Sequence, residues 1–292
     1  FLYTGNLNVP ENIRVIIDTL FVKNAKTPLD ELNLRHRHYM KSEKYKGEIH
    51  FSTGTNTARS SSNFYALNNT IATLFEIRGV GIAKTSFKRR IKSSLAVGFS
   101  YLKTAYENSN FIFEQIEFAN NYSNDIVLDH KRTTSKEIIK AIDIESNELI
   151  DFSTTMHSSK KSIATLLRDR PIAYIIKKNN MGFMEKLNDV GVNYVEFEKD
   201  TMIYSGGYKV VEFNNNFKVY EKMKMQKVVT SIEYNNNKFS KGDILISMNQ
   251  KRSNLIAELL EPEAPNSYVS FGIIKTAINK QLPIYRIKNF NN

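Results

Sequence analysis

The sequence contains no cysteine, and this absence removes several kinds of chemistry. The 292 residues hold no disulfide, no thiolate ligand for a metal and no cysteine nucleophile. The cellular compartment stays open, because a cysteine-free chain suits the cytoplasm as well as a bacterial periplasm. No apolar run approaches the roughly 20 residues of a membrane helix, so we expect no membrane span.

The composition supports a folded core. Hydrophobic residues make up 41% of the chain and aromatic residues 11%, which suits one large or two ordinary domains. The chain begins with Phe1 and not with methionine, which we interpret as a fragment or a processed chain. The formal net charge of +11 suits nucleic acid, but the basic residues are spread out and form no known motif. We therefore expect no nucleic-acid partner.

Apolar spacing predicts two helices and a strand in the first part of the chain. Residues 10–25 predict a helix that begins at Pro10 and ends before Thr27-Pro28. Residues 33–65 are polar and aromatic, and we expect an irregular loop there that serves a site. The apolar run 70–77 is typical of a buried strand, and residues 85–107 place apolar side chains at steps of three and four, as in a long helix.

A composition shift at the asparagine-rich residues 120–124 indicates a domain boundary, so we expect domains over residues 1–120 and 125–292. The second part predicts strands at 171–176, 208–213, 226–233 and 243–248, a short helix at 183–188, and turns at the asparagine runs 214–216 and 235–237. The predicted fold class is therefore α/β, followed by a smaller, β-rich mixed domain.

No local metal motif involves the five histidines, which are His36, His38, His50, His130 and His157. His36 and His38 alternate and would share a strand face, but they need a third ligand from elsewhere to hold a metal; otherwise they lie in a solvated basic loop. His50 is expected to be structural or solvent-facing, and His130 and His157 have no obvious partner. The serines 60–62 match no known nucleophile motif, and Gly79-x-Gly81 lacks the remainder of a phosphate loop.

Glu76 is the most informative residue, because carboxylates seldom enter apolar strands without a partner or a role. If residues 70–77 form a strand, Glu76 lies near its carboxyl end, where sites form in open α/β sheets. It would then be either an ion-pair partner of Arg78, which shares its strand face, or a general base. Periodicity alone slightly favours the ion pair. Arg59, Tyr65 and Arg78 are the other candidate site residues.

The order of these features carries a resemblance. Residues 57–91 contain an arginine, a loop rich in serine, asparagine and tyrosine, an apolar run ending in Glu-x-Arg-Gly, and Phe-x-x-Arg-Arg opening a long helix. This order resembles the zinc metallocarboxypeptidases of the carboxypeptidase A-like family, especially bacterial members with an extra C-terminal domain. The runs 170–174, 259–262 and 282–286 are also similar, so the resemblance covers essentially the whole chain.

The resemblance implies the C-terminal part of a mixed-sheet α/β/α peptidase fold and an accessory domain. It implies that Glu76 deprotonates a zinc-bound water, which attacks the scissile carbonyl, and then passes the proton to the leaving amine. Arg59 would bind a carboxylate of the substrate, with Tyr65 lining the pocket and Arg78 nearby. The substrate would be a peptide or a peptidoglycan-like molecule. The location expected from such relatives is periplasmic or extracellular.

One departure from the family pattern concerns the metal. The family's zinc ligands come from an H-x-x-E pair and a later histidine, and none of these can be matched here, so we expect them upstream of Phe1. The chain alone is therefore expected to be inactive. The alternative function is a catalytically inactive carboxypeptidase-like protein that binds peptide or carbohydrate. The sequence gives no indication of oligomeric state.

Overall fold

The computed structural model describes residues 1–178 and 183–289, and their contacts divide the chain into two compact units. Unit 1 comprises Phe1–Ala119 and His130–Ile163, and unit 2 comprises Asn120–Asp129 and the residues from Ala164 onward. The predicted peptidase and accessory domains, 1–120 and 125–292, stay a prediction. Within the described residues, no helix is both long enough and apolar enough to span a membrane.

Unit 1 begins with consecutive helical segments. Helix α1 spans Glu11–Ile16, a π-helical turn spans Ile17–Val22, and α2 spans Lys23–Glu31. The predicted apolar face is confirmed, because it is largely buried, with Ile13, Ile16, Ile17 and Phe21 enclosed. The predicted stop before Pro28 is wrong, since Pro28 lies inside α2. Packing outweighs the local effect of the proline, because Ala25 and Leu29 on either side of it are buried.

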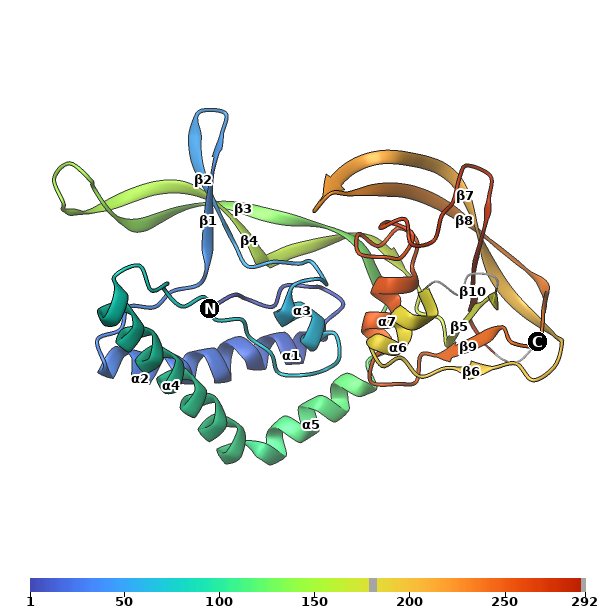
Figure 1. Ribbon diagram of the computed structural model, residues 1–292, viewed down its shortest axis with the longest axis horizontal. Helices are drawn as coiled ribbons and strands as arrows, with labels where there is room; N and C mark the ends of the chain where they lie inside the picture. Colours follow the sequence, from blue (N-terminus) through green and yellow to red (C-terminus); the bar gives the residue numbers. More distant parts are fainter. Residues whose placement is uncertain (179–182, 290–292) are drawn as a thin grey trace. The chain divides into compact units, whose positions relative to one another are not determined.

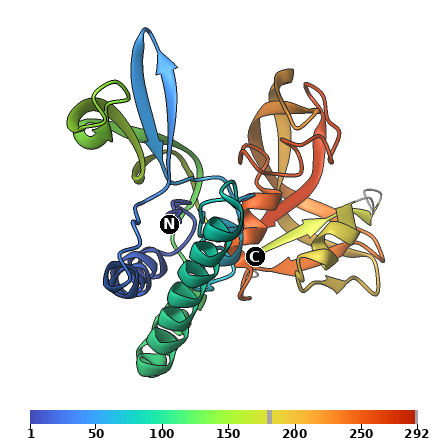
Figure 2. The same cartoon turned by 60° about the vertical axis from the view of Figure 1, so that its left-hand side comes forward.

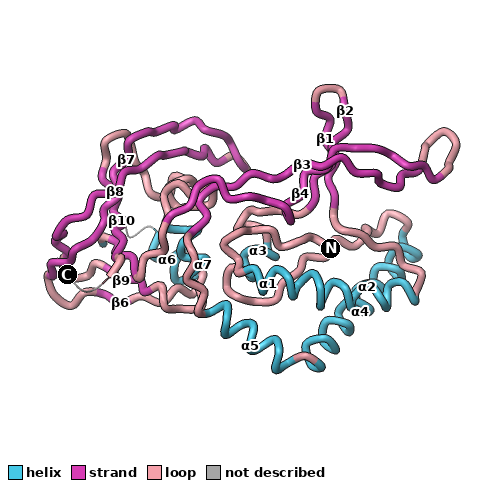
Figure 3. The backbone as a smooth tube through the Cα atoms, turned by 180° about the vertical axis from the view of Figure 1, so that it is seen from behind, coloured by secondary structure: helices cyan, strands magenta, loops and turns pink. Residues whose placement is uncertain are grey.

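Three more helices follow. Helix α3 spans Ser61–Ala66, α4 spans Ala83–Glu107 and α5 spans Ser109–Asn120. Helix α4 confirms the long helix predicted over residues 85–107, and it packs along α2 (Figure 1). The helices α1 to α5 are drawn in cyan in Figure 3.

A four-stranded mixed sheet has the order β1-β2-β4-β3, with β1 at Met40–Tyr45, β2 at Glu48–Thr53, β3 at Ile126–Ile142 and β4 at Leu149–Arg168. β1 and β2 are antiparallel, and β2 pairs with β4 in parallel. The irregular loop predicted over residues 33–65 is therefore wrong in part. The turn of this hairpin has positive φ at Lys46 (50°) and Gly47 (86°), the backbone that a two-residue hairpin turn requires, and Gly47 was its signal in the sequence.

The second sheet belongs to unit 2 and has the order β6-β9-β5-β10-β7-β8, with antiparallel neighbours throughout the described pairs. Its strands are β5 at Ala173–Ile176, β6 at Val195–Glu196, β7 at Thr201–Tyr220, β8 at Met223–Phe239, β9 at Ile244–Ser247 and β10 at Gln281–Ile287. Helices α6, at Met184–Asp189, and α7, at Ser253–Leu260, accompany it. The predicted α/β class with a β-rich second part is confirmed.

The predicted turns at the two asparagine runs are wrong. Both runs lie inside the long β7–β8 hairpin, where Asn235 pairs with Ser205 and Asn237 with Ile203. The Asn237 side chain also donates from Nδ2 to the Ser205 carbonyl at 2.9 Å. Continuous pairing with a partner strand therefore outweighs the local preference of asparagine for turns.

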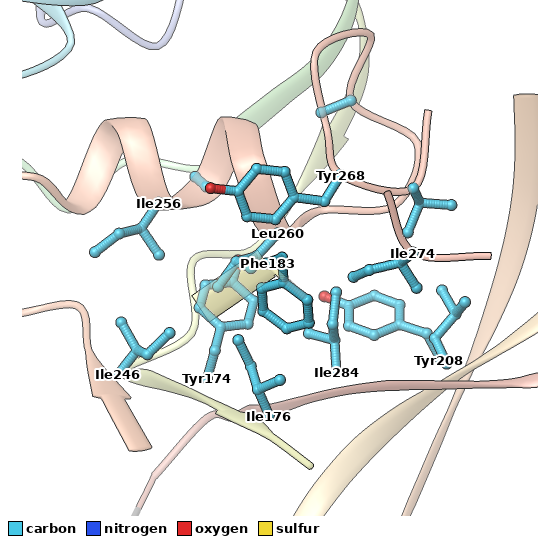
Figure 4. Close-up of a cluster of buried hydrophobic side chains, with 14 of the residues drawn as sticks. Tyr174, Ile176, Phe183, Tyr208, Ile246, Ile256, Leu260, Tyr268, Ile274 and Ile284 are labelled. Atoms are coloured by element: carbon cyan, nitrogen blue, oxygen red, sulfur yellow. The ribbon is translucent and has the colours of Figure 1, made fainter. Parts of the chain in front are cut away.

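The core of unit 2 combines apolar packing with enclosed charges. Tyr174, Phe183 and Tyr208 pack among isoleucines and leucines from the sheet, α7 and the segment that follows it (Figure 4). Both tyrosine hydroxyls donate to Oε1 of the fully buried Glu261, at 2.5 Å from Tyr174 and 2.9 Å from Tyr208. Burial, and then the charge of Glu261, raise the pKa of both tyrosines. The Leu-Leu-Glu-Pro run thus carries a structural carboxylate.

Candidate functional site

The segment that carries Glu76 is extended but is not a strand of either sheet. Residues 70–78 make one isolated bridge, in which the Leu2 amide donates to the Leu74 carbonyl at 2.8 Å. Thr4 adds a side-chain hydrogen bond to the Ala72 carbonyl at 3.2 Å. The strand predicted over 70–77 is therefore wrong for the described residues. An apolar run predicts burial, but a strand also requires a partner that pairs with it repeatedly.

At the end of this segment, from Phe75 to Arg78, partly covered and exposed side chains alternate. Phe75 and Ile77 are partly covered, and the Phe75 ring packs edge-on against Phe1 at 5.0 Å and Tyr101 at 5.2 Å. Glu76 and Arg78 are both exposed. The shared strand face stays a prediction, because the segment is not a strand. Within the described part of the chain, the Glu76 carboxylate makes no hydrogen bond or ion pair, with Arg78 or any other residue.

Glu76 is thus neither the buried acid nor the ion-pair partner that its surroundings in the sequence suggested. An exposed carboxylate keeps its hydration and needs no compensating charge. Its backbone surroundings are nevertheless fixed. Arg90 of α4 donates from Nη1 to the carbonyl of Ile77 at 2.9 Å and to that of Arg78 at 3.4 Å. The first turns of α4 therefore hold the segment just after Glu76.

Arg59 and Tyr65 lie on either side of the start of α3. The Arg59 side chain is exposed, and its Nε donates to Oγ1 of Thr57 at 3.3 Å. The Ser60 hydroxyl accepts the amide of Asn63 at 3.4 Å and caps α3, so this residue of the serine cluster has a structural role. Tyr65 is 55% exposed on α3, and its ring contacts that of Phe64.

Asn63 is a positioning residue that sequence reasoning missed. It is fully buried, and its Nδ2 donates to the carbonyls of Thr55 and Thr57, each at 2.9 Å. Its Oδ1 accepts the Asn6 amide at 3.2 Å. These bonds hold the turn that carries Arg59 against α3. The signal available in the sequence was its place three residues after Ser60, where side chains close a helix N-terminus.

The chain between the two pairs of candidates is short and tied down. The Thr70 amide donates to the Tyr65 carbonyl at 3.2 Å, and the buried Asn69 donates from Nδ2 to the Ala119 carbonyl at 3.2 Å. The four candidates therefore lie within one stretch of unit 1, but among the described residues Glu76 makes no hydrogen bond or ion pair with the other three. Their roles stay predictions.

The histidines of unit 1 form pairs with other groups. His36 bonds to Asp30 at 2.8 Å, whereas His38 lies 3.9 Å from Asp18, so the two do not share a ligand site. Burial, followed by the charge of Lys160, lowers the pKa of His38 to about 4.

His50 and His157 are a pair that the sequence did not predict, because 107 positions separate them. Nδ1 of His50 lies 2.9 Å from Nε2 of His157, and the Glu48 carboxylate is 3.6 Å from Nε2 of His50. The parallel pairing of β2 with β4 brings them together. Two imidazoles fall short of a metal site. Residues 1–178 and 183–289 contain no group of three or more metal-ligating side chains that could hold a metal ion.

The curated proteins similar to this chain include three that are named carboxypeptidase 2. The chain is 29% identical over 298 residues to carboxypeptidase 2 of Trichophyton equinum, and 29% identical over 298 residues to that of Trichophyton rubrum. It is 27% identical over 293 residues to carboxypeptidase 2 of Trichophyton tonsurans. Each match covers 99% of this chain and 54% of the relative, so the chain spans about half the length of these curated relatives.

No family model and no solved structure matches the chain. The similarity therefore supports the carboxypeptidase part of the resemblance. It does not support a bacterial type, because the relatives are fungal. The zinc, the position of the ligands and the truncation stay predictions.

Proposed function

We propose that this chain is part of a carboxypeptidase in which Glu76 is the general base and then the general acid. The observation that carries the proposal is the similarity to three proteins named carboxypeptidase 2 over 99% of the chain. The substrate is a peptide with a free C-terminal carboxylate, and the product is its C-terminal residue. By the same resemblance, the protein is exported.

The surroundings of Glu76 support this role. Its carboxylate is exposed and not engaged by any described side chain, so a water molecule and a substrate can approach it. Glu76 takes a proton from water, and the resulting hydroxide bonds to the scissile carbonyl carbon. When the C–N bond breaks, Glu76 gives the proton to the departing nitrogen. Fixed backbone next to the base limits the geometries in which this transfer occurs.

The cationic candidates fit an anionic substrate. A guanidinium binds a carboxylate through two parallel hydrogen bonds, and Arg59 is exposed at the turn that Asn63 holds. We assign Arg59 to the C-terminal carboxylate of the substrate and Tyr65 to the wall of the pocket. Arg78 is exposed two residues after Glu76 and adds positive charge there.

The described residues do not fit a zinc ion, because no set of three ligating side chains comes together among them. We infer that the zinc ligands lie in polypeptide outside these 292 residues, and we expect the chain by itself to be inactive.

The test is release of C-terminal amino acids by the natural protein that contains these residues. Glu76→Gln keeps the shape and removes the base, so kcat should fall by about 10³-fold while the folded structure is kept. Glu145→Gln, at an exposed turn, is the matched control and should leave kcat unchanged. A Glu76→Gln enzyme with normal kcat contradicts the proposal. Turnover by the isolated chain with stoichiometric zinc would contradict the prediction that the chain by itself is inactive.

A further inference from the structure

The loop that joins the Glu76 segment to α4 has little packing of its own. No described atom beyond the neighbouring residues lies within 4 Å of the place where Gly79 or Gly81 would carry a Cβ. Val80 and Ile82 are 53% and 61% exposed. Glycines in uncovered backbone permit many conformations. A fixed geometry just after Glu76 therefore requires a tie from elsewhere.

Arg90, in the second turn of α4, supplies such a tie. Its Nη1 donates to the Ile77 carbonyl at 2.9 Å and to the Arg78 carbonyl at 3.4 Å, across 13 and 12 positions of the chain. One arm of the guanidinium thus binds both peptide carbonyls that follow Glu76. A guanidinium holds its donors in a rigid plane, whereas the ammonium of lysine is a compact donor on a flexible stem, so arginine suits this bridge. In Figure 2, α4 is the long teal helix that begins at the loop.

Helix α4 is itself fixed to the rest of unit 1. It packs along α2, where Nδ2 of Asn24 donates to Oγ1 of the buried Thr104 at 3.1 Å. On the other side of Glu76, the ring of Phe75 packs at 5.2 Å on that of Tyr101, which is also a residue of α4. The chain before Glu76 and the chain after it are therefore both held by one anchored helix.

We propose that Arg90 is a positioning residue for the general base and acts through the two carbonyls that follow Glu76. The inference rests on the proposed function. Arg90 contacts neither the substrate nor the reacting atoms; it limits the directions that the Glu76 carboxylate can take, so that both proton transfers occur from one geometry. Without this limit, fewer molecules hold the carboxylate in the reacting orientation. The loss falls on kcat, while KM is kept because substrate binding does not involve Arg90.

The first experiment is kinetics of the natural protein that contains these 292 residues, on the peptide used to test Glu76→Gln. Arg90→Ala should lower kcat by about tenfold and change KM by less than about twofold. Arg90 is exposed and alanine is the best helix former, so the fold is preserved. Arg90→Lys keeps the charge and one donor, and it should restore kcat to within about threefold of the wild-type value.

Lys88→Ala is the matched control. It removes the same charge from an exposed position in the same helix, and within the described residues Lys88 makes no hydrogen bond or ion pair. Its kcat should stay within about twofold of the wild-type value. An equal loss of kcat in Lys88→Ala and Arg90→Ala would show that general positive charge matters and not the bridge, which overturns the proposal.

A double-mutant cycle separates positioning from a general structural effect. In the Glu76→Gln background, Arg90→Ala should change the residual kcat by less than about twofold, because the base that it orients is already absent. The same tenfold loss in both backgrounds contradicts the proposal. A normal kcat in Arg90→Ala, or a loss that appears in KM instead of kcat, contradicts it as well.

Hydrogen exchange tests the tie itself without turnover. The amides of residues 78–82 should exchange at least about tenfold faster in Arg90→Ala than in the wild type, while those of α2 stay unchanged. Equal exchange of residues 78–82 in the two proteins overturns the inference. A normal kcat in Glu76→Gln removes the proposed function and with it the base that Arg90 positions. A kcat that falls in Glu76→Gln but not in Arg90→Ala removes this inference alone.

Discussion

Glu261 and Glu263 in unit 2 are enclosed, whereas Glu76 in unit 1 is exposed. This difference determines whether a substitution affects folding or chemistry. Glu261 and Glu263 are enclosed beside Arg168, whose Nη1 lies 2.6 Å from the first and 2.8 Å from the second. Removing one member of such a set leaves buried charge without compensation. Glu76 is exposed, so its replacement costs little stability. A loss of turnover in Glu76→Gln therefore reports chemistry, whereas a loss at Glu261 would report folding.

Glu263 predicts an acid-dependent loss of stability in unit 2. Its burial by itself would raise its pKa, but the hydrogen bond and charge of Arg168, with two hydrogen bonds from Thr230, lower the pKa below the ordinary value. Because the pKa is lower in the folded state, this stabilisation is complete above about pH 4.3, the unfolded value, and is lost as the pH falls through the folded value.

Glu263→Gln should therefore destabilise the protein by about 2 kcal/mol at pH 7 and by less than half of that at pH 3. Urea unfolding followed by circular dichroism measures both values. Glu198→Gln, at an exposed position, should change neither. A difference between wild type and Glu263→Gln that is the same at pH 7 and pH 3 would show that the charge of Glu263 does not contribute.

At the scale of helices and strands, the spacing of apolar residues predicted the features that depend on a single segment. It missed the features that depend on pairing or contact between two segments. The spacing of apolar residues located α4, and the continuous apolar run at 171–176 located β5. The run at 70–77 has the residues of a strand, but pairing depends on another segment and is absent among the described residues apart from one bridge. The His50–His157 contact likewise depends on the β2–β4 register, which no local pattern encodes.

For the candidate site, too, the sequence predicted local features and missed those that depend on contacts with other segments. The sequence placed Arg59, Tyr65, Glu76 and Arg78 in one stretch, and the structure describes all four in unit 1. Their roles stay predictions. The sequence did not predict the exposure of Glu76, because exposure depends on what packs against the segment. Nor did it predict Asn63, whose three hydrogen bonds reach residues 6, 55 and 57. The position of Asn63 in the sequence indicates a residue near a helix N-terminus. It does not indicate hydrogen bonds that join two loops.

We predict that the start of α3 depends on the side chain of Asn63. Asn63→Ala leaves the buried Asn6 amide without its acceptor and removes one of the two donors to each of the Thr55 and Thr57 carbonyls, so the free energy of unfolding should fall by about 2 kcal/mol. Hydrogen exchange of residues 57–66 should accelerate with it. Asn68→Ala is the matched control: it removes one hydrogen bond, to the Phe64 carbonyl, and should cost less than about 1 kcal/mol. Equal losses would contradict the role assigned to Asn63.

At the scale of the whole molecule, β3 and β4 belong to both units. Residues 126–129 of β3 and 164–168 of β4 are part of unit 2, while their remainders complete the sheet of unit 1. Within unit 1, Thr154 donates to the Ile49 carbonyl at 2.6 Å and Arg132 donates to Oδ1 of Asn56 at 3.1 Å. These contacts make β2 and the following loop depend on residues that lie after residue 120. The domain boundary predicted near residue 120 therefore needs a test of whether residues 1–120 fold alone.

Two truncated chains test whether residues 1–120 fold without β3 and β4. A chain ending at Asn121 lacks β3 and β4, so the parallel partner of β2 and the ion pair between Lys160 and Asp18, at 2.5 Å, are lost. A chain ending at Arg168 keeps both strands. We expect amide protection of residues 48–53 to fall at least about tenfold in the shorter chain relative to the longer one, because unpaired edge strands open readily. Hydrogen exchange followed by mass spectrometry measures this, with residues 11–31 as the internal reference. Equal protection of residues 48–53 in the two chains would instead establish that residues 1–120 fold without the strands that follow.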